Sequence, residues 1–344
     1  MRLYKKTLHL LAATAVLGGF TLATVTPADA QRESIRWATS NTGSYGYMVG
    51  SAMAQVLERA LGDDVVVTVQ PYPSTTAAMK ATMEGDAEVG YTADVGMRQI
   101  YDADGAFQGY EAPLGRLVHT WYAYPMESFM AAPIATADNY SCWGDFSGEP
   151  VFFTPAGFMN WLNFRRIYNA LGYEFNHVEI DPSTKADALE GGSITGAVAY
   201  TTAGRSLAAY WRETELRTDV KIINPCDDEI EALRAAGLAP MEVDPSNAFS
   251  KDVGVETVYG VPILFAYNLR PDMDADLAYR MLVAFYEARD ELAESDPGFV
   301  PMANDFVGMQ VAGISANPDI PVHAGLARFL EEHDAWNDDW TIAE

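Results

Sequence analysis

The sequence predicts an α/β protein with two lobes, and three features of the chain carry this prediction. Strand and helix patterns alternate in one run before residue 125 and in a second run after residue 150. Each strand pattern ends in a polar turn, and a long extended segment at 257–268 follows the second run. Alternation of this kind is typical of a parallel sheet that helices cover on both faces.

The first run begins with a strand, a polar turn and an amphipathic helix. Val49, Met53, Val56 and Leu57 recur at helical spacing and would lie on one buried face. Further strands are expected at 65–69, 88–92 and 116–124, after the first at 35–38, and further helices at 74–83 and 93–101.

The second run repeats the alternation, and Gly172 ends its first helix. Strands are expected at 151–154, 177–180, 196–200 and 220–223, with helices at 158–171, 184–190 and 205–212. The extended segment would return the chain to the first lobe, where helices follow at 274–294 and 322–333. The expected division is a leader at 1–30, a first lobe of 31–125 and 255–344, and a second lobe of 126–254.

The N-terminus carries the pattern of a secretory signal peptide. Arg2, Lys5 and Lys6 precede an apolar run at 8–25, and Ala-Asp-Ala at 28–30 forms a cleavage site. An uncleaved membrane anchor is the alternative, but the small residues of the run and the cleavage pattern argue against it. We therefore expect a protein that is exported to the periplasm, with no later segment apolar enough to span a membrane.

The composition restricts the possible partners. The apolar fraction of 49% is that of a globular protein, and the formal net charge is −26. Such a charge disfavours nucleic acid and anionic membrane surfaces. An anionic ligand would be repelled at long range, so local dipoles and a few placed cations would have to hold it.

The chain has two cysteines, Cys142 and Cys226. In an oxidising compartment this count permits one disulfide, and two buried free thiols are the alternative. Their spacing matches no metal site, and we expect no metal and no cofactor.

Polar turns at the strand ends form the candidate site. In open parallel sheets, ligands bind at the carboxyl ends of the strands. A Gly- and Ser-rich turn that opens a helix, as at 39–47, presents free N–H groups that suit a carboxylate. Singly, each turn is better explained as an ordinary loop, but their recurrence favours one shared site. The predicted ligand-binding residues are Thr42, Gly43, Ser44, Tyr45, Tyr47, Ser74, Thr75, Thr92, Asp94, Gly157, Phe158, Met159, Asn160, Thr201, Thr202 and Arg205.

Arginine is the natural bidentate partner of a carboxylate. Arg205 is the first choice because it follows a candidate turn, whereas Arg98 is better explained as a surface residue. Asp272, Asp274 and Asp276 lack the glycine and glutamate of a calcium loop and are better explained as acids at a helix N-terminus.

Signatures of catalysis are missing from the sequence. There is no G-x-S-x-G, G-x-x-x-x-G-K-[ST] or G-x-G-x-x-G motif, and His119, His177, His323 and His333 show no paired spacing. We therefore expect a binding protein and no enzyme. A secreted hydrolase or lyase on the same architecture is the alternative, and a sensor domain outside transport is a third possibility.

Several segments follow a known family pattern in order and spacing. The first loop carries Thr39, Thr42, Gly43, Tyr47 and Gly50 in place. Weaker matches lie at 74–78, 85–90, 145–151 and 321–325. Together these segments resemble the TAXI family of substrate-binding proteins, which serve TRAP transporters. The resemblance implies a type II periplasmic binding fold with a ligand cleft between the lobes, closure by hinge motion, a small carboxylate ligand, and delivery to a TRAP membrane permease driven by an ion gradient.

One loop departs from the family pattern. Where the family has a cradle of small residues, this chain has Phe158 and Met159. The departure suggests a ligand with one carboxylate and an apolar or aromatic part, or simply a smaller ligand. The alternative is that Met159 and Trp161 point into the core of the second lobe.

Overall fold

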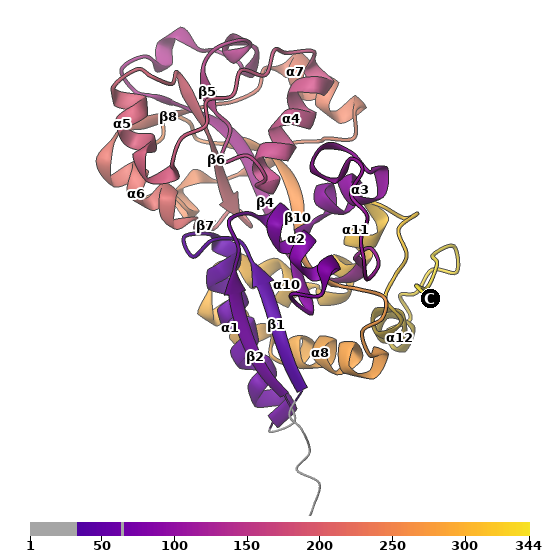
Figure 1. The fold of residues 1–344 in the computed structure, drawn as a ribbon. Coiled ribbons are helices and arrows are strands. Elements are labelled where there is room, and N and C mark those ends of the chain that lie inside the picture. The colour runs from indigo at the N-terminus through magenta and orange to yellow at the C-terminus, as the bar shows by residue number, and fades with distance from the viewer. Residues whose placement is uncertain (1–32, 63–64) are drawn as a thin grey trace, which may run out of the picture. The chain divides into compact units, whose positions relative to one another are not determined.

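Ten strands form one mixed sheet within the part of the chain that the structure, a computed structural model, describes, namely residues 33–62 and 65–344 (Figure 1). The predicted leader lies outside these residues. The strands are β1 (Glu33–Thr39), β2 (Val65–Pro71), β3 (Val89–Ala93), β4 (Val118–Pro133), β5 (Val151–Phe152), β6 (Gly196–Thr202), β7 (Ser206–Leu207), β8 (Val220–Ile223), β9 (Met241–Val243) and β10 (Val258–Leu269). None of the described helices is long and apolar enough to cross a bilayer.

The strand order is β2-β1-β3-β10-β4-β6-β5. Strand β1 is parallel to both β2 and β3, but β10 enters antiparallel between β3 and β4. The prediction of a purely parallel sheet is therefore wrong, because the returning strand inserts into the middle of the first lobe's sheet. The extended segment predicted at 257–268 is confirmed as β10.

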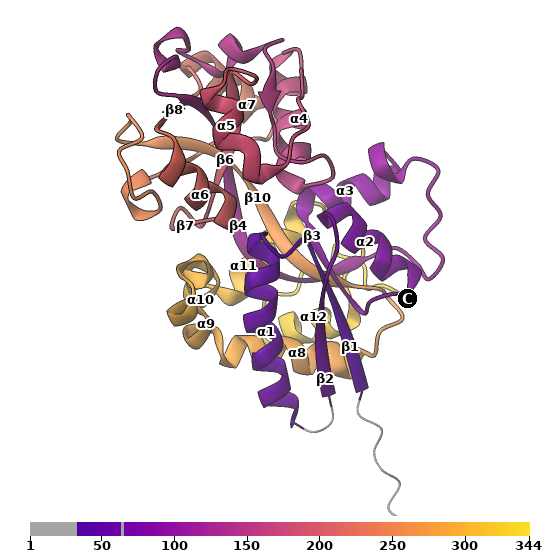
Figure 2. The same ribbon diagram turned by 60° about the vertical axis from the view of Figure 1, so that its left-hand side comes forward.

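Strands β4 and β10 connect two groups of elements, which we call the first and the second lobe (Figure 2). One part of β4 pairs with β10, and its later part pairs with β6 and β8 of the second lobe. The pairing of β4 with β10 shifts register between Phe265 and Ala266, a local irregularity that bends paired strands. This two-lobed α/β arrangement is the fold class that the sequence predicts.

Helices cover the sheet in both lobes. In the first lobe they are α1 (Tyr45–Leu61), α2 (Thr75–Glu84), α3 (Asp94–Asp102), α8 (Ala275–Glu287), α9 (Arg289–Ser295), α10 (Val300–Asn304), α11 (Phe306–Ser315) and α12 (Ala324–Glu332). In the second lobe they are α4 (Met159–Leu171), α5 (Lys185–Glu190), α6 (Ala209–Arg217) and α7 (Asp227–Ala235).

Side-chain caps explain where several helices begin. Ser44 accepts a hydrogen bond from the Tyr47 amide at 3.1 Å, and Ser74 accepts one from the Ala77 amide at 3.2 Å. Asp274 caps α8 by accepting from the Leu277 amide at 2.8 Å, which confirms its interpretation as a helix N-terminal acid.

Three predicted elements differ from the structure. Residues 177–180 form no strand; His177 makes only an isolated bridge to Val151, because β5 is too short to extend a ladder. The helix predicted at 205–212 begins only at Ala209, because Ala203 and Gly204 take positive φ angles and fold Ser206 and Leu207 back onto β6. The long helix at 274–294 is divided at residue 288. Helix α7 was not predicted.

The structure joins Cys142 to Cys226 in a disulfide, the pairing that the sequence left open. The two Cα atoms lie 5.2 Å apart, within the usual range for a disulfide. The bond ties the loop before residue 143 to the start of α7, two segments that are 84 residues apart in the chain.

Candidate functional site

Turns from both lobes meet at one small cavity, which we call the inner cell. Its volume is about 10 Å³, roughly the space that one water molecule needs. The residues that line it are Ser40, Ser44, Tyr45, Thr75, Tyr91, Met126, Phe158, Asn160, Tyr200 and Phe265.

The polar groups of the inner cell hydrogen-bond to one another or to nearby groups. The hydroxyls of Ser40 and Thr75 lie 2.8 Å apart, and the Asn160 amide donates to the Ser128 hydroxyl at 3.1 Å. Tyr124 donates to the Tyr91 hydroxyl at 2.9 Å. The inner cell is therefore lined by hydrogen-bonded polar groups together with aromatic rings.

Three helices begin at the inner cell. Ser44 and Tyr45 start α1, Thr75 starts α2, and Phe158 is the residue before α4. Helix N-termini carry partial positive charge and unpaired N–H groups. Because α1 and α2 belong to the first lobe and α4 to the second, both lobes direct positive dipole ends toward the same place.

Hydrogen bonds between three pairs of residues join the two lobes, and we call these three contacts the latches. The Thr76 amide and hydroxyl donate to the Gly157 carbonyl at 3.2 and 3.0 Å. The Tyr210 hydroxyl donates to Asn41 Oδ1. The Ser206 hydroxyl donates to Asp296 Oδ1 at 3.2 Å. The latches hold the two lobes in contact around the cell.

A second hollow between the lobes lies beside the inner cell, and we call it the outer chamber. Its volume is about 300 Å³. Phe158 lines both hollows. The outer chamber is lined by Thr76, Gln99, Gly105, Ala106, Ala156, Gly157, Phe158, Met159, Trp161, Leu162 and Arg165.

The structure brings some of the predicted site residues together. Ser44, Tyr45, Thr75, Phe158 and Asn160 line the inner cell. Gly157 and Met159 join Phe158 on the wall of the outer chamber. Met159 contacts the first lobe, since a Cβ on Gly96 of α3 would lie only 2.7 Å from its sulfur. The Trp161 ring, in contrast, packs against Phe175 and His177 of the second lobe, as the alternative interpretation expected.

Other predicted residues line neither hollow. Thr92 accepts a hydrogen bond from Asn268 at 2.8 Å, and Thr201 donates to Glu127 at 2.8 Å. Asp94 is partly buried and accepts from the amides of Val95 and Leu264. Thr42 and Arg205 are exposed, and the remaining predicted residues that line neither hollow are Gly43, Tyr47, Ser74 and Thr202.

Burial shifts the pKa values of Asp94 on α3 and Arg166 on α4, two groups of opposite charge that lie near each other. Burial raises the pKa of Asp94, and the nearby positive charge of Arg166 opposes this rise. Burial likewise lowers the pKa of Arg166, and Asp94 opposes that shift. The pair contributes to the seam between the lobes and lines neither hollow.

Sequence reasoning missed Ser40, Tyr91, Met126, Tyr200 and Phe265 as cell-lining residues. Tyr91 and Tyr200 are the first residues of two predicted polar turns, at 91–94 and 200–205, but they were not included among the ligand-binding residues. Met126 and Phe265 lie on β4 and β10, and no local pattern marks them. Their place at the cell follows only from the crossing of these strands.

The residues that line the inner cell include no histidine, carboxylate, lysine or cysteine. His119 is buried elsewhere, within hydrogen-bond distance of the Tyr122 hydroxyl and the Asn317 carbonyl, and burial lowers its pKa to about 4. The pair of His177 and Glu179 lies in the second lobe, where the Glu179 carboxylate also accepts from the Ala156 amide. The cell therefore offers a binding chemistry, with no nucleophile and base side by side.

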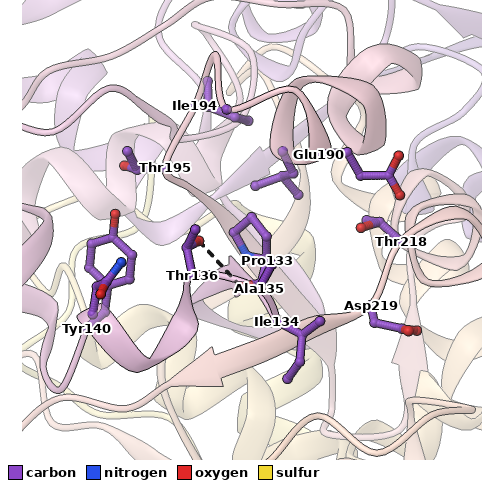
Figure 3. A pocket seen from close by; sticks show the side chains of 13 residues that line it. Pro133, Ile134, Ala135, Thr136, Tyr140, Glu190, Ile194, Thr195, Thr218 and Asp219 are labelled. Atoms are coloured by element: carbon purple, nitrogen blue, oxygen red, sulfur yellow. Dashed lines mark hydrogen bonds between the residues drawn. The ribbon is translucent and has the colours of Figure 1, made fainter.

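Two larger hollows lie within the second lobe, away from the inner cell. One of about 500 Å³ lies beside Pro133, Ile134, Glu190, Thr195 and Asp219 (Figure 3). Thr195 precedes β6, so this hollow adjoins the amino end of that strand, opposite to the end where ligands bind in parallel sheets. The other, of about 580 Å³, is formed by the loop from Asp244 to Glu256.

Several solved structures are similar to this chain in arrangement. The alkanesulfonate-binding protein SsuA from Xanthomonas axonopodis pv. citri, bound to MOPS, is 12% identical over 90% of this chain and 96% of that chain, with a TM-score of 0.48. The periplasmic aliphatic sulphonate binding protein SsuA from Escherichia coli is 14% identical over 87% and 78%, with a TM-score of 0.47. Identities this low carry no information on the ligand of this chain.

Comparison with curated proteins finds no sequence match. The model of one protein family, described as the NMT1-like family, matches residues 37–333. This range includes the turn after β1, the crossing strands β4 and β10, and every residue of the inner cell. Because the match spans most of the chain, this protein belongs to the NMT1-like family.

Proposed function

We propose that this protein is a solute-binding protein that holds a small organic anion between its two lobes. The observation that carries the proposal is the meeting of three helix N-termini, from both lobes, at the inner cell. In a chain with a net charge of −26, such dipole ends supply local positive potential for an anion. The favoured anion is a carboxylate.

Binding in this proposal requires the lobes to open and close. An inner cell of about 10 Å³ admits no organic molecule, so a solute enters only when the latches part. Strands β4 and β10 link the lobes and are the natural hinge. The lobes would then be residues 31–125 with 255–344, and residues 126–254.

The proposal extends to the cellular role. The signal-peptide pattern favours export to the periplasm, and the TAXI resemblance favours delivery of the solute to a TRAP permease. If the permease binds the closed conformation best, a protein that holds solute will bind to the permease more tightly than an empty one. Deletion of the gene for such a permease is expected to abolish uptake of the ligand while leaving binding to the purified protein unchanged.

A thermal-shift screen against small carboxylates and sulfonates tests the binding function. A ligand at 100 times its Kd stabilises a protein by about 2.7 kcal/mol, which is a readily measured shift in Tm. We expect at least one organic anion to produce such a shift, and its neutral amide to produce none. If no organic anion stabilises the protein, the proposed function is wrong.

A pair of matched variants then locates the site. Thr75→Val removes a hydroxyl at the inner cell, whereas Thr82→Val removes a hydroxyl on the same helix that donates to the Ala78 carbonyl away from the cell. We expect Thr75→Val to weaken binding of the identified anion about tenfold, the equivalent of about 1.4 kcal/mol. Equal effects of the two variants in calorimetry would place the anion elsewhere.

A further inference from the structure

We propose that the outer chamber is a subsite for the apolar body of the ligand, that Arg165 binds its charged group, and that Phe158 is the wall that limits its length. This inference rests on the proposed function and narrows it to an organic anion with an aromatic or branched apolar body. Its charged group lies at Arg165 in the outer chamber, where the start of α4 also forms part of the wall, and not within the inner cell. The geometry of the seam between the lobes carries it.

The two hollows differ in the size of guest that they accept. The inner cell, at about 10 Å³, has room for one water, whereas the outer chamber, at about 300 Å³, has the size of a small-ligand pocket. Both lobes contribute to the chamber, through Thr76, Gln99 and Ala106 from the first lobe and the start of α4 from the second. A guest in the chamber therefore contacts both lobes while the latches are closed.

The lining of the chamber is mainly apolar. Ala106, Phe158, Met159, Trp161 and Leu162 form its apolar wall. Ligand pockets typically combine such a wall with a few polar groups that fix orientation. The wall thus accommodates a ring or a branched chain better than it accommodates a second charged group.

Arg165 supplies the cation of the chamber. Its guanidinium lies 4.9 Å from the centre of the Trp161 ring, and no ion pair among the described residues involves it. Arg98, by contrast, is paired with both Asp102 and Asp319. A guanidinium on the chamber wall that forms no ion pair within the described part of the chain fits an anionic group.

Phe158 stands between the chamber and the polar cell. It is buried, lines both hollows, and holds the position before the first residue of α4. Its backbone is fixed, because its amide donates to the Pro155 carbonyl and its carbonyl accepts from the Leu162 amide. Removing the ring would join the two hollows into one longer site without altering the latches.

Calorimetry with phenylacetate and its neutral analogue phenylacetamide tests the role of Arg165. We expect the full secreted chain to prefer the acid at least tenfold, and Arg165→Gln to abolish this preference. Arg234→Gln, at an exposed position of α7, is the matched control and should keep it. Retention of the full preference by Arg165→Gln would overturn the assignment of the cation.

Two variants of the chamber wall test the position of the apolar body. Leu162→Phe fills the chamber and is expected to weaken phenylacetate binding at least tenfold, with a melting curve close to that of the wild type. Phe158→Ala is expected to improve binding of 4-phenylbutyrate relative to phenylacetate at least fivefold. Unchanged phenylacetate affinity in Leu162→Phe would overturn the subsite. An unchanged ratio of the affinities for 4-phenylbutyrate and phenylacetate in Phe158→Ala would overturn the role of Phe158 as the wall.

Failure of this inference can be distinguished from failure of the proposed function. If hydrophilic acids such as glutamate bind the wild type but phenylacetate does not, the chamber is no subsite and the solute-binding function stands. If neither kind of acid binds the wild type or the Phe158→Ala variant, both the inference and the proposed function are wrong.

Discussion

The two lobes differ in the interactions that stabilise them. The first lobe has seven-residue strands β1 and β2, the 17-residue helix α1, and a buried group of large aromatic residues in which Trp37 contacts Trp121, Tyr267 and Phe285. In the second lobe, β5 and β7 have two residues each and β9 has three. Such short strands supply few ladder hydrogen bonds, so this lobe depends more on individual links between loops.

The links of the second lobe are concentrated around the disulfide. Buried Glu229 accepts hydrogen bonds from the amides of Trp143, Gly144 and Cys226 and from the Tyr173 hydroxyl. The disulfide itself joins the same two loops. Aromatic rings pack together in the second lobe as well, around Phe153, Phe164 and Tyr168, so the difference between the lobes lies in the short strands and the loop links. The comparison therefore implies that the second lobe loses its structure first when these links are cut.

The largest effect is expected from removal of the disulfide. Cys142→Ser combined with Cys226→Ser releases a loop of 84 residues, which in the chain-entropy account costs about 4 kcal/mol of stability. Hydrogen exchange monitored by mass spectrometry should accelerate in β5, β6 and β8, with β1 to β3 much less affected. Equal acceleration in both lobes would contradict the difference that we infer between them.

A second prediction concerns Glu127, on the crossing strand β4. Burial raises its pKa from 4.5 to about 7, against the opposing effect of hydrogen bonds from the Gly204 amide and the Thr201 hydroxyl. The folded state therefore prefers the protonated acid, and its contribution to stability is lost as pH rises from 4.5 through 7. Glu127→Gln should remove this loss, which amounts to about 3 kcal/mol between pH 4 and pH 8. Urea denaturation at these two pH values measures it.

The first lobe is expected to show the opposite pH dependence, through His119. Burial lowers the pKa of this histidine from 6.5 to about 4. The unfolded chain therefore takes up a proton first, and stability falls as pH drops from 6.5 through 4, again by about 3 kcal/mol. Urea denaturation of His119→Gln should show a weaker decline toward pH 4 than the wild type shows. A parallel decline in both proteins would assign the effect to other groups.

The smallest effect is expected at a latch between the lobes. Tyr210→Phe removes the hydrogen bond to Asn41, with a cost of about 1 kcal/mol to the closed arrangement. The radius of gyration in small-angle X-ray scattering should increase, and ligand affinity should fall about fivefold. Tyr259→Phe, which loses only a 3.5 Å contact to Glu242 between β10 and β9, is the control. Equal scattering curves for both variants would show that this latch does not hold the lobes together.

Particular residues show how far sequence reasoning reaches. Ser44 and Ser74 were expected to precede helices, and both cap them, because a cap depends only on residues three positions apart. Thr92 and Thr201 were selected because they lie in polar turns at strand ends, yet their hydroxyls bond to Asn268 and Glu127, which are distant in the chain. The direction in which a hydroxyl points at a strand end depends on the neighbouring strand, and that neighbour is not read from local sequence.

By itself, the sequence determined the local features of this protein. It determined the alternation of strands and helices, most helix starts, the return of the chain at β10 and the polar character of the strand ends, because hydrophobic period, turn chemistry and capping act over a few residues. Only the tertiary structure decided which turns face the inner cell, that Cys142 meets Cys226, and that Phe158 lines both hollows between the lobes. These outcomes depend on how β4 and β10 cross between the lobes, a contact among residues far apart in the chain that no short window of sequence encodes.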